Sequence, residues 1–280
     1  MKRQKSISLL ILAFTLIFQG IDIKAKNTQK AVIVNILMPA PFAESTKAIV
    51  KRFNKKNHKK IYLKITKGPM ETEAVSDLAI SNLLLGTNEY DALLIDVTWL
   101  PKYAAAGWLA PLEKYIDTNK WNTLTRGARM GNSFKGNIYR WPFVADMGLL
   151  YWRTDLMEKP PKTPKQLTKI GSFLKENNKV KYGFVWQGRQ YEGLSCFFLE
   201  ILKGFGGNWI NDQNKVELNS INSIKAASWI LELINKGISP TSVTNFAENE
   251  SLQVFKAGDA AFMRNWPYAW SELQKKESKV

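Results

Sequence analysis

Apolar runs alternate with amphipathic stretches in the first part of the chain. The predicted strands are residues 31–38, 61–66 and 90–95, and the third is apolar enough to be buried on both faces. Two helices are predicted between them, one that begins near Glu44 and one over residues 71–85, which Gly86 ends. Strands and helices in this alternation are typical of a parallel sheet with helices on its faces.

The pattern changes after residue 118, where the apolar runs become shorter. The predicted strands here are residues 136–141, 148–152, 182–186 and 260–264. The predicted helices are one that begins at Pro164 behind a capping Thr163, and residues 192–204, 223–235 and 249–257. The sequence therefore predicts three parts: a leader over residues 1–25, a first domain over residues 26–138 and a second over residues 139–280.

The N-terminus has the composition of a secretory signal peptide. Lys2, Arg3 and Lys5 precede an apolar run over residues 7–18, and Ala25 offers a small residue before a cleavage point. The run is shorter than the ~20 residues of a membrane-spanning helix, and an uncleaved anchor is the alternative. We expect a soluble mature protein in the periplasm or another extracytoplasmic space.

Several kinds of chemistry are excluded by composition. The chain has one Cys and one His, which rules out an internal disulfide, a cysteine–histidine zinc site and an iron–sulfur cluster, and argues against a Ser-His-Asp triad. It has 10 Trp, so aromatic rings, carboxylates and amides are the groups left to act on a ligand. We expect no cofactor and no metal.

The formal net charge of +16 raises the question of an anionic partner. The densest basic run, residues 51–60, follows an amphipathic stretch and predicts the exposed face and C-terminal end of a helix. No nucleic-acid-binding motif accompanies it, so a solvated face is favoured and no nucleic acid partner is expected. A basic protein that binds nucleic acid or an anionic membrane stays a third hypothesis, and it predicts steeply salt-dependent binding.

Aromatic residues stand beside carboxylates or amides at four predicted strand ends. The four clusters are Asp96 with Trp99; Trp141, Phe143 and Asp146; Trp186, Gln187, Gln190, Tyr191 and Glu192; and Asn265, Trp266, Tyr268 and Trp270. Such groups suit a sugar, whose hydroxyls bind polar side chains and whose C–H faces lie on aromatic rings. One cluster alone is more typical of packing, and the recurrence of the pattern favours carbohydrate binding.

Four segments resemble the periplasmic sugar-binding proteins of ABC importers, in particular the trehalose/maltose-binding branch. These segments are residues 90–116, 136–156, 183–207 and 255–270, in the family's order. The resemblance implies an α/β periplasmic binding protein of type II fold, with two lobes joined by a hinge. It also implies a carbohydrate or polyol ligand, such as trehalose, maltose, sucrose or glucosylglycerol, permease subunits as partners, and no catalysis.

The resemblance also implies the ligand contacts. Asp96 and Trp99 would contribute from the first lobe and Asp146 from the entry to the second. The second lobe would add Tyr191, Glu192, Trp266 and Tyr268. Glu44 matches a position where the family often places a polar contact, and Gln187 comes from the clusters above.

Two further expectations follow from the sequence. Members of the resembled family continue well beyond the Asn265–Tyr268 motif, so the fold is expected to be C-terminally incomplete. The isolated chain is expected to be marginally stable or aggregation-prone and to bind sugar weakly or not at all. The alternative function is a secreted glycoside hydrolase, which would use two of the carboxylates Asp96, Asp146 and Glu192.

Overall fold

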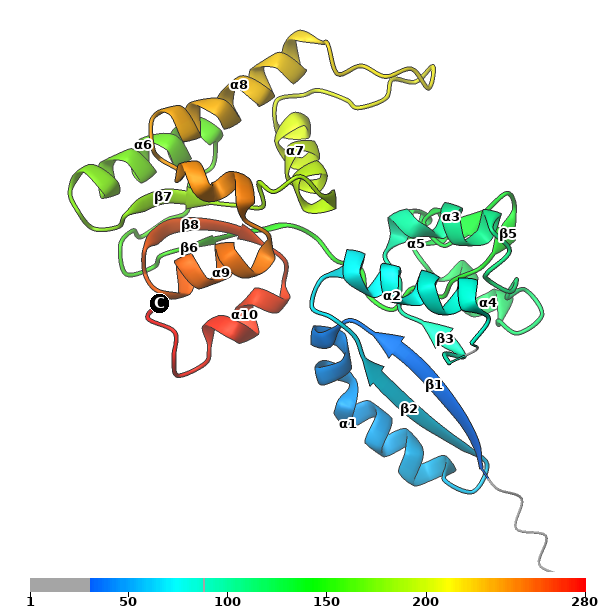
Figure 1. The fold of residues 1–280 in the computed structure, drawn as a ribbon. Coiled ribbons are helices and arrows are strands. Elements are labelled where there is room, and N and C mark those ends of the chain that lie inside the picture. Colours follow the sequence, from blue (N-terminus) through cyan, green and yellow to red (C-terminus); the bar gives the residue numbers. More distant parts are fainter. Residues whose placement is uncertain (1–30, 88) are drawn as a thin grey trace, which may run out of the picture. The chain divides into compact units, whose positions relative to one another are not determined.

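The structure is a computed structural model that describes residues 31–87 and 89–280 (Figure 1). The expected signal peptide, residues 1–25, lies outside the described residues. The chain divides into two compact units, the first ending at Trp141 and the second spanning Pro142–Val280. The division expected from the sequence follows residue 138, and the role of these units as lobes around a ligand stays a prediction.

The first unit is built on a parallel three-stranded sheet. Its strands are β1 (Val32–Met38), β2 (Ile61–Lys67) and β3 (Ala92–Leu93), in the order β2-β1-β3. Helix α1 (Ala40–Asn57) connects β1 to β2, and α2 (Thr72–Leu85) connects β2 to β3 (Figure 1). The predicted β-α-β-α-β arrangement is therefore confirmed.

Two local predictions in this unit are wrong. Helix α1 begins at Ala40, before Glu44, because a proline in the first helical turn needs no hydrogen-bond acceptor for its nitrogen. Strand β3 has two residues in place of the expected 90–95, and its residues are not buried on both faces. At the start of this edge strand, the backbone nitrogen of Asp91 donates to the Asn35 carbonyl oxygen at 2.8 Å, and the Asp91 side chain accepts a hydrogen bond from the backbone nitrogen of Asn35 at 2.8 Å.

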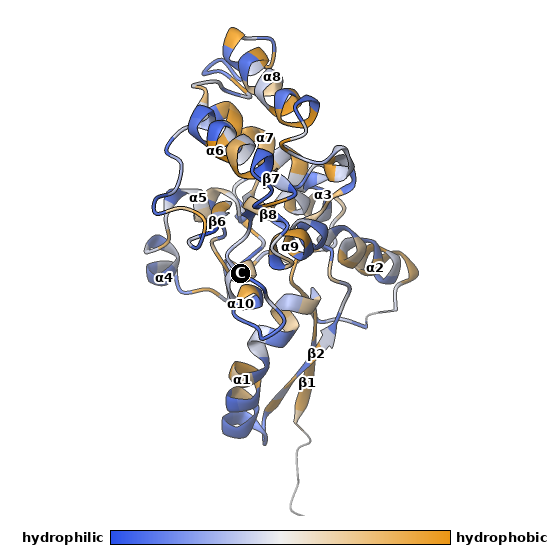
Figure 2. Ribbon diagram, turned by 90° about the vertical axis from the view of Figure 1, so that its left-hand side faces the viewer, coloured by the Kyte–Doolittle hydropathy of each residue, from blue (hydrophilic) through white to orange (hydrophobic). Residues whose placement is uncertain are grey.

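The ends of α1 and α2 follow the sequence signals. Gly86 has φ of 65°, the left-handed conformation that ends a helix, as predicted. The basic run also forms the exposed C-terminal end of α1, with Lys55 and Lys56 in the last turn, and Figure 2 shows this end coloured hydrophilic.

Short elements complete the first unit. They are η1 (Val97–Trp99), α3 (Leu100–Ala105), α4 (Thr118–Asn122), α5 (Arg126–Met130), β4 (Ser133–Phe134) and β5 (Asn137–Ile138). The expected strand over 136–141 is shortened to β5, because Lys135 and Gly136, both with positive φ, form a tight turn between β4 and β5. The core contains Leu37 and Tyr103, and the Tyr103 hydroxyl lies 2.9 Å from Ser76 Oγ.

The second unit has a mixed sheet in the order β6-β8-β7. Strand β8 (Ala260–Asn265) is central and buried along its whole length. It pairs antiparallel with β6 (Leu149–Trp152) and parallel with β7 (Tyr182–Val185). All three strands are predicted by the sequence, but their order is a property of the tertiary structure.

Helices surround this sheet. They are α6 (Pro164–Glu176), α7 (Glu192–Gly204), α8 (Ile221–Asn235), α9 (Glu248–Lys256) and α10 (Tyr268–Leu273), with the short helix η2 (Thr241–Asn245). The sequence predicts the first four within two residues and misses α10 and η2. As predicted, Thr163 caps α6, accepting a hydrogen bond from Gln166 N at 3.2 Å. Among the helices described, none has the length and apolar character needed to cross a membrane.

Candidate functional site

Asp96 follows β3 and begins the helix η1. Its Oδ1 accepts hydrogen bonds from the backbone nitrogen of Thr98 at 3.0 Å and from the Thr98 hydroxyl at 3.2 Å. The carbonyl oxygen of Asp96 accepts a hydrogen bond from Arg140 Nη1 at 2.5 Å. Desolvation lowers the pKa of the Arg140 guanidinium, and the charge of Asp96 opposes that shift. The Asp96 carboxylate is therefore held in a defined direction near the half-buried Arg140.

Trp99 lies one helical turn beyond Asp96. Its half-buried ring packs against the core of the first unit, which includes Leu37 and Tyr103. The Lys102 ammonium lies 5.3 Å from the ring centroid. Part of the Trp99 ring is thus committed to packing, and its contact with a ligand stays a prediction.

Glu44 lies within α1 and not in the loop after β1. Its exposed carboxylate forms ion pairs with Lys47 and with Lys67, the latter at 3.0 Å. Hydrogen bonds from these lysines lower the pKa of the Glu44 carboxyl. The carboxylate is held ionised between two cations, and a role in ligand binding stays a prediction.

Trp266 directly follows β8 and is fixed on several sides. Its indole nitrogen donates a hydrogen bond to Glu248 Oε1 at 2.9 Å. The Arg264 guanidinium carbon lies 3.8 Å from the ring centroid, and the Tyr151 hydroxyl donates to the Trp266 carbonyl oxygen at 2.8 Å. The ring itself is half-buried, so a ligand can reach part of it.

Gln187 is fully buried and bonds to Arg264, whose guanidinium lies over the Trp266 ring. Its Oε1 accepts a hydrogen bond from Arg264 Nη1 at 2.9 Å, and its Nε2 donates to the Arg264 carbonyl oxygen at 3.0 Å. Both ends of the amide are used within the protein. These two hydrogen bonds hold Arg264 in place. A direct contact between Gln187 and a ligand stays a prediction, and the geometry does not favour it.

Asp146 lies in the exposed segment before β6. Desolvation raises the pKa of its carboxyl, while a backbone hydrogen bond at Met147 and the charge of Arg264 act in the opposite direction. The charge of Arg264 therefore acts on the Asp146 carboxyl, and the Arg264 guanidinium also lies over the Trp266 ring.

Tyr191 and Glu192 begin helix α7. The Arg189 guanidinium carbon lies 4.8 Å from the centroid of the Tyr191 ring. Glu192 lies in the first turn of α7, where a carboxylate is stabilised by the helix dipole, and accepts a weak hydrogen bond from Cys196 Sγ at 3.7 Å. Both side chains are half-buried, and Cys196, inside the helix predicted over residues 192–204, is half-buried as well.

Tyr268 begins helix α10 and is also half-buried. Burial raises the pKa of its phenol well above the usual value, and the charges of Glu248 and Glu272 add to the shift. The hydroxyl is therefore protonated under ordinary conditions and able to donate a hydrogen bond.

Three charged residues around Trp266 escaped the sequence analysis: Glu200, Glu248 and Arg264. Arg264 carried a usable signal, because it follows four apolar residues in a predicted strand and a buried guanidinium needs partners. Its partner Glu200 carried no signal in the sequence, because it lies in α7, 64 positions away along the chain.

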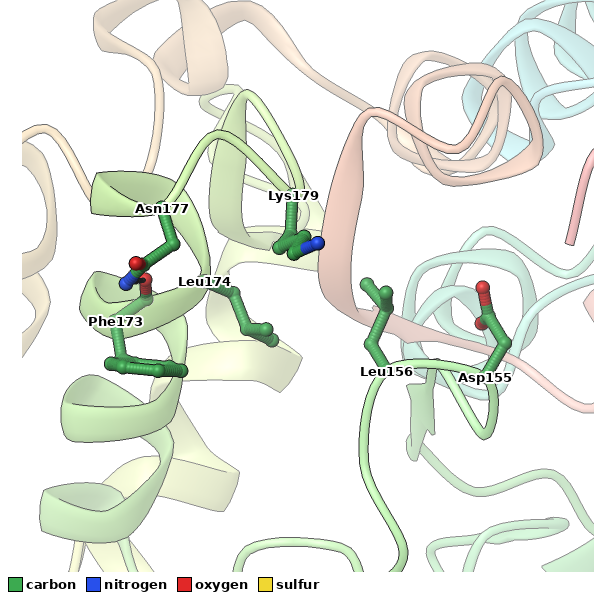
Figure 3. Close-up of a pocket in the computed structure, with 6 residues that line it drawn as sticks. All are labelled: Asp155, Leu156, Phe173, Leu174, Asn177 and Lys179. Carbon is green, nitrogen blue, oxygen red and sulfur yellow. Dashed lines mark hydrogen bonds between the residues drawn. The ribbon is translucent and has the colours of Figure 1, made fainter.

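A surface hollow of the second unit lies apart from these residues. Its lining is drawn in Figure 3 and consists of Asp155, Leu156, Phe173, Leu174, Asn177 and Lys179. None of the predicted ligand contacts belongs to it, so the hollow is not the site that the sequence predicts.

Comparison with known proteins identifies the family. Residues 39–280 match the family described as bacterial extracellular solute-binding protein. The chain is also 34% identical to a probable ABC transporter-binding protein of Deinococcus radiodurans, over 78% of this chain and 54% of that protein. This chain belongs to the bacterial extracellular solute-binding protein family. The resemblance seen in the sequence is thereby confirmed.

Other relatives of this solute-binding protein carry named ligands. It is 27% identical to a maltotriose-binding protein of Pyrococcus abyssi, over 61% of this chain and 36% of that protein. The solved structure of maltose-bound MalE3 of T. maritima superimposes with a TM-score of 0.80 at 32% identity, over 89% of this chain and 65% of that one. These matches confirm the α/β fold class, and the chain spans about half the length of the first curated relative it matches.

Proposed function

We propose that this protein is the extracytoplasmic substrate-binding component of an ABC importer and captures a carbohydrate or a related polyol. The observation that carries the proposal is the half-buried Trp266 ring. Its indole nitrogen donates a hydrogen bond to Glu248, and the guanidinium of Arg264, which has carboxylate neighbours, lies over the ring. A fixed aromatic ring beside polar groups binds the apolar C–H face and the hydroxyls of a sugar together.

The class of ligand is supported by the relatives. The maltotriose-binding protein and the maltose-bound MalE3 described above are named for ligands that are polyhydroxylated and uncharged. Trehalose, maltose, sucrose and glucosylglycerol are the ligands proposed for this protein from the sequence. The ligand contacts proposed in the second unit are Asp146, Tyr191, Glu192, Trp266 and Tyr268, and those in the first unit are Asp96, Trp99 and Glu44.

The proposal extends to location and partners. A basic, then apolar N-terminal segment supports export by a cleavable signal peptide. The protein would then hand its ligand to the membrane permease subunits of the importer, and it would catalyse no reaction.

Calorimetric titration tests the proposal. The four named sugars and mannitol are titrated into a chain that carries the C-terminal part expected from the family, where binding of at least one is expected. Trp266→Ala should weaken binding by ~2 kcal/mol or more, as for a buried aromatic anchor. The matched control is Tyr115→Ala, since Tyr115 is an aromatic residue outside the proposed ligand contacts and is 81% exposed. Absence of heat with every mono- and oligosaccharide would overturn the proposal.

The hydrolase alternative is tested with the same protein. Incubation with aryl glycosides should release no reducing sugar. Release that is lost in Asp146→Asn would favour a glycoside hydrolase and remove the transport proposal.

A further inference from the structure

Arg264 is a buried cation in an apolar strand. Its side chain is on the central strand β8, all of whose residues are buried, and the residue is 3% exposed. Arg264 Nε donates to Glu200 Oε2 at 3.1 Å, and its Nη2 forms an ion pair with the other carboxylate oxygen. Together with the hydrogen bond to Gln187, this two-point pairing fixes the plane of the guanidinium.

Space for the pair is provided by Gly148. A methyl group at this position would overlap Glu200 Oε1 and lie 2.6 Å from Arg264 Nη2. Any larger residue would therefore displace the ion pair. Residues 148, 187 and 200, from three segments of the chain, therefore surround the Arg264 guanidinium.

Stability alone does not account for this arrangement. Burying a guanidinium removes its hydration, and an apolar residue of similar volume commonly stabilises a fold as well as a buried ion pair does. The fixed guanidinium lies over the Trp266 ring, 3.8 Å from its centroid. It therefore covers one face of the indole, while Glu248 holds the indole nitrogen at 2.9 Å.

We propose, on the basis of the proposed function, that Arg264 is a positioning residue for the carbohydrate site. With Glu200 holding it in plane, it fixes the Trp266 ring so that a sugar stacks only on the indole face that Arg264 leaves uncovered. Arg264 acts through Trp266 and makes no contact with the ligand. Sugar binding therefore depends on the ion pair between Arg264 and Glu200, which lies on the opposite side of the Trp266 ring from the proposed ligand.

The first test needs no ligand. In protein with ¹⁵N-labelled tryptophan, the spectrum of Trp266→Phe identifies the indole resonance of Trp266. Arg264→Met, which keeps an unbranched aliphatic stem but removes the planar charge, should shift or broaden that resonance and leave the Trp270 resonance unchanged. An unchanged Trp266 resonance would overturn the proposal. This test holds even if no sugar binds to the wild-type protein, a result that would remove only the proposed function.

The second test is a double-mutant cycle on sugar affinity. Arg264→Met should weaken binding at least tenfold in the wild-type background and less than threefold in the Trp266→Ala background. Arg264→Lys keeps the charge without the flat guanidinium and should lose affinity as Arg264→Met does. An equal loss in both backgrounds would show a direct ligand contact or a general effect on the fold, and would overturn the proposal.

A milder variant covers the case in which Arg264→Met does not fold. Glu200 is partly exposed, so Glu200→Gln keeps the shape of the pair and removes only its charge. We expect a smaller loss of affinity, about threefold, that disappears in the Trp266→Ala background. The matched control is Glu232→Gln, an exposed carboxylate of α8 paired with Lys236, which should leave affinity unchanged. No loss in Glu200→Gln together with an unchanged Trp266 resonance would overturn the proposal.

Discussion

Gly171 in α6 and Gly183 in β7 bring the helix and the strand into direct backbone contact. A methyl group on Gly183 would lie 2.8 Å from the Cα of Gly171 and 2.6 Å from Ile238 Cγ2. Neither glycine has a positive φ, so the two are needed for space and not for conformation. This close approach seats α6 on the sheet of the second unit.

Replacement of Gly183 by alanine should therefore destabilise the second unit. The added methyl group overpacks a site bounded by backbone, which typically costs about 1–3 kcal/mol of unfolding free energy. Urea denaturation followed by circular dichroism measures the change. The control is Gly204→Ala at the end of α7, where an added methyl group meets no atom within 4 Å. Equal stability of Gly183→Ala and Gly204→Ala would contradict the packing argument.

Ser239 should be needed for the buried Trp186. The indole nitrogen of Trp186 donates to Ser239 Oγ at 3.1 Å, and the Ser239 hydroxyl donates to the Phe184 carbonyl oxygen at 2.7 Å. Ser239→Ala leaves the buried indole donor without its acceptor, at a cost of about 1–3 kcal/mol in unfolding free energy. Thermal unfolding compares this variant with Ser45→Ala, whose hydroxyl is exposed. A cost no larger than that of the control would show that the indole nitrogen finds another acceptor.

Asp155 should stabilise the fold at neutral pH but not in acid. Arg153 donates to its two carboxylate oxygens at 2.7 and 2.6 Å, which lowers the pKa of Asp155. This stabilisation is present above the unfolded pKa of ~3.9 and is lost as the pH falls through the lower folded value. Asp155→Asn should cost about 0.5 kcal/mol at pH 7, because the Asp155 carboxylate is largely exposed, and almost nothing near pH 2.

Urea denaturation at the two pH values measures this difference. Asp212→Asn is a suitable control, because Asp212 is exposed and takes part in none of the ion pairs found among the described residues. A cost of Asp155→Asn that is the same at both pH values would rule out the ion pair as its source.

Asp146 should make sugar binding depend on pH. Desolvation raises the pKa of this carboxyl, so it takes up a proton at a higher pH than an ordinary aspartate. If the ionised carboxylate accepts hydrogen bonds from sugar hydroxyls, affinity should fall as the pH is lowered through that raised pKa. Asp146→Asn should bind more weakly at neutral pH and lose this part of the dependence.

The pKa shift of Asp146 changes stability with pH in the opposite direction to that of Asp155. A raised folded pKa means that folded Asp146 binds its proton more tightly than the unfolded chain does, so acid favours the folded state through this group. Calorimetric titrations between about pH 7 and pH 4 compare the wild-type protein with Asp146→Asn. Parallel affinity curves would show that Asp146 is not the titrating ligand contact.

Local signals in the sequence determined most of the helices and where they end. Helix α7 spans Glu192–Gly204 as predicted, and α2 ends at the left-handed Gly86. These elements depend on periodicity and caps within a few residues, which local sequence records directly. The aromatic and carboxylate residues at strand ends also indicated the family, because a sugar site needs those residue types whatever the details of the fold.

Only the tertiary structure decided the rest. Residues 90–95 form a two-residue edge strand in place of the longer strand predicted, and strand order β6-β8-β7 depends on pairing between distant segments. The surroundings of Trp266 depend on Arg264 meeting Gln187 and Glu200. Contacts between residues that are 64 and 77 positions apart leave no periodicity in the chain, because chain folding and not local propensity brings such residues together.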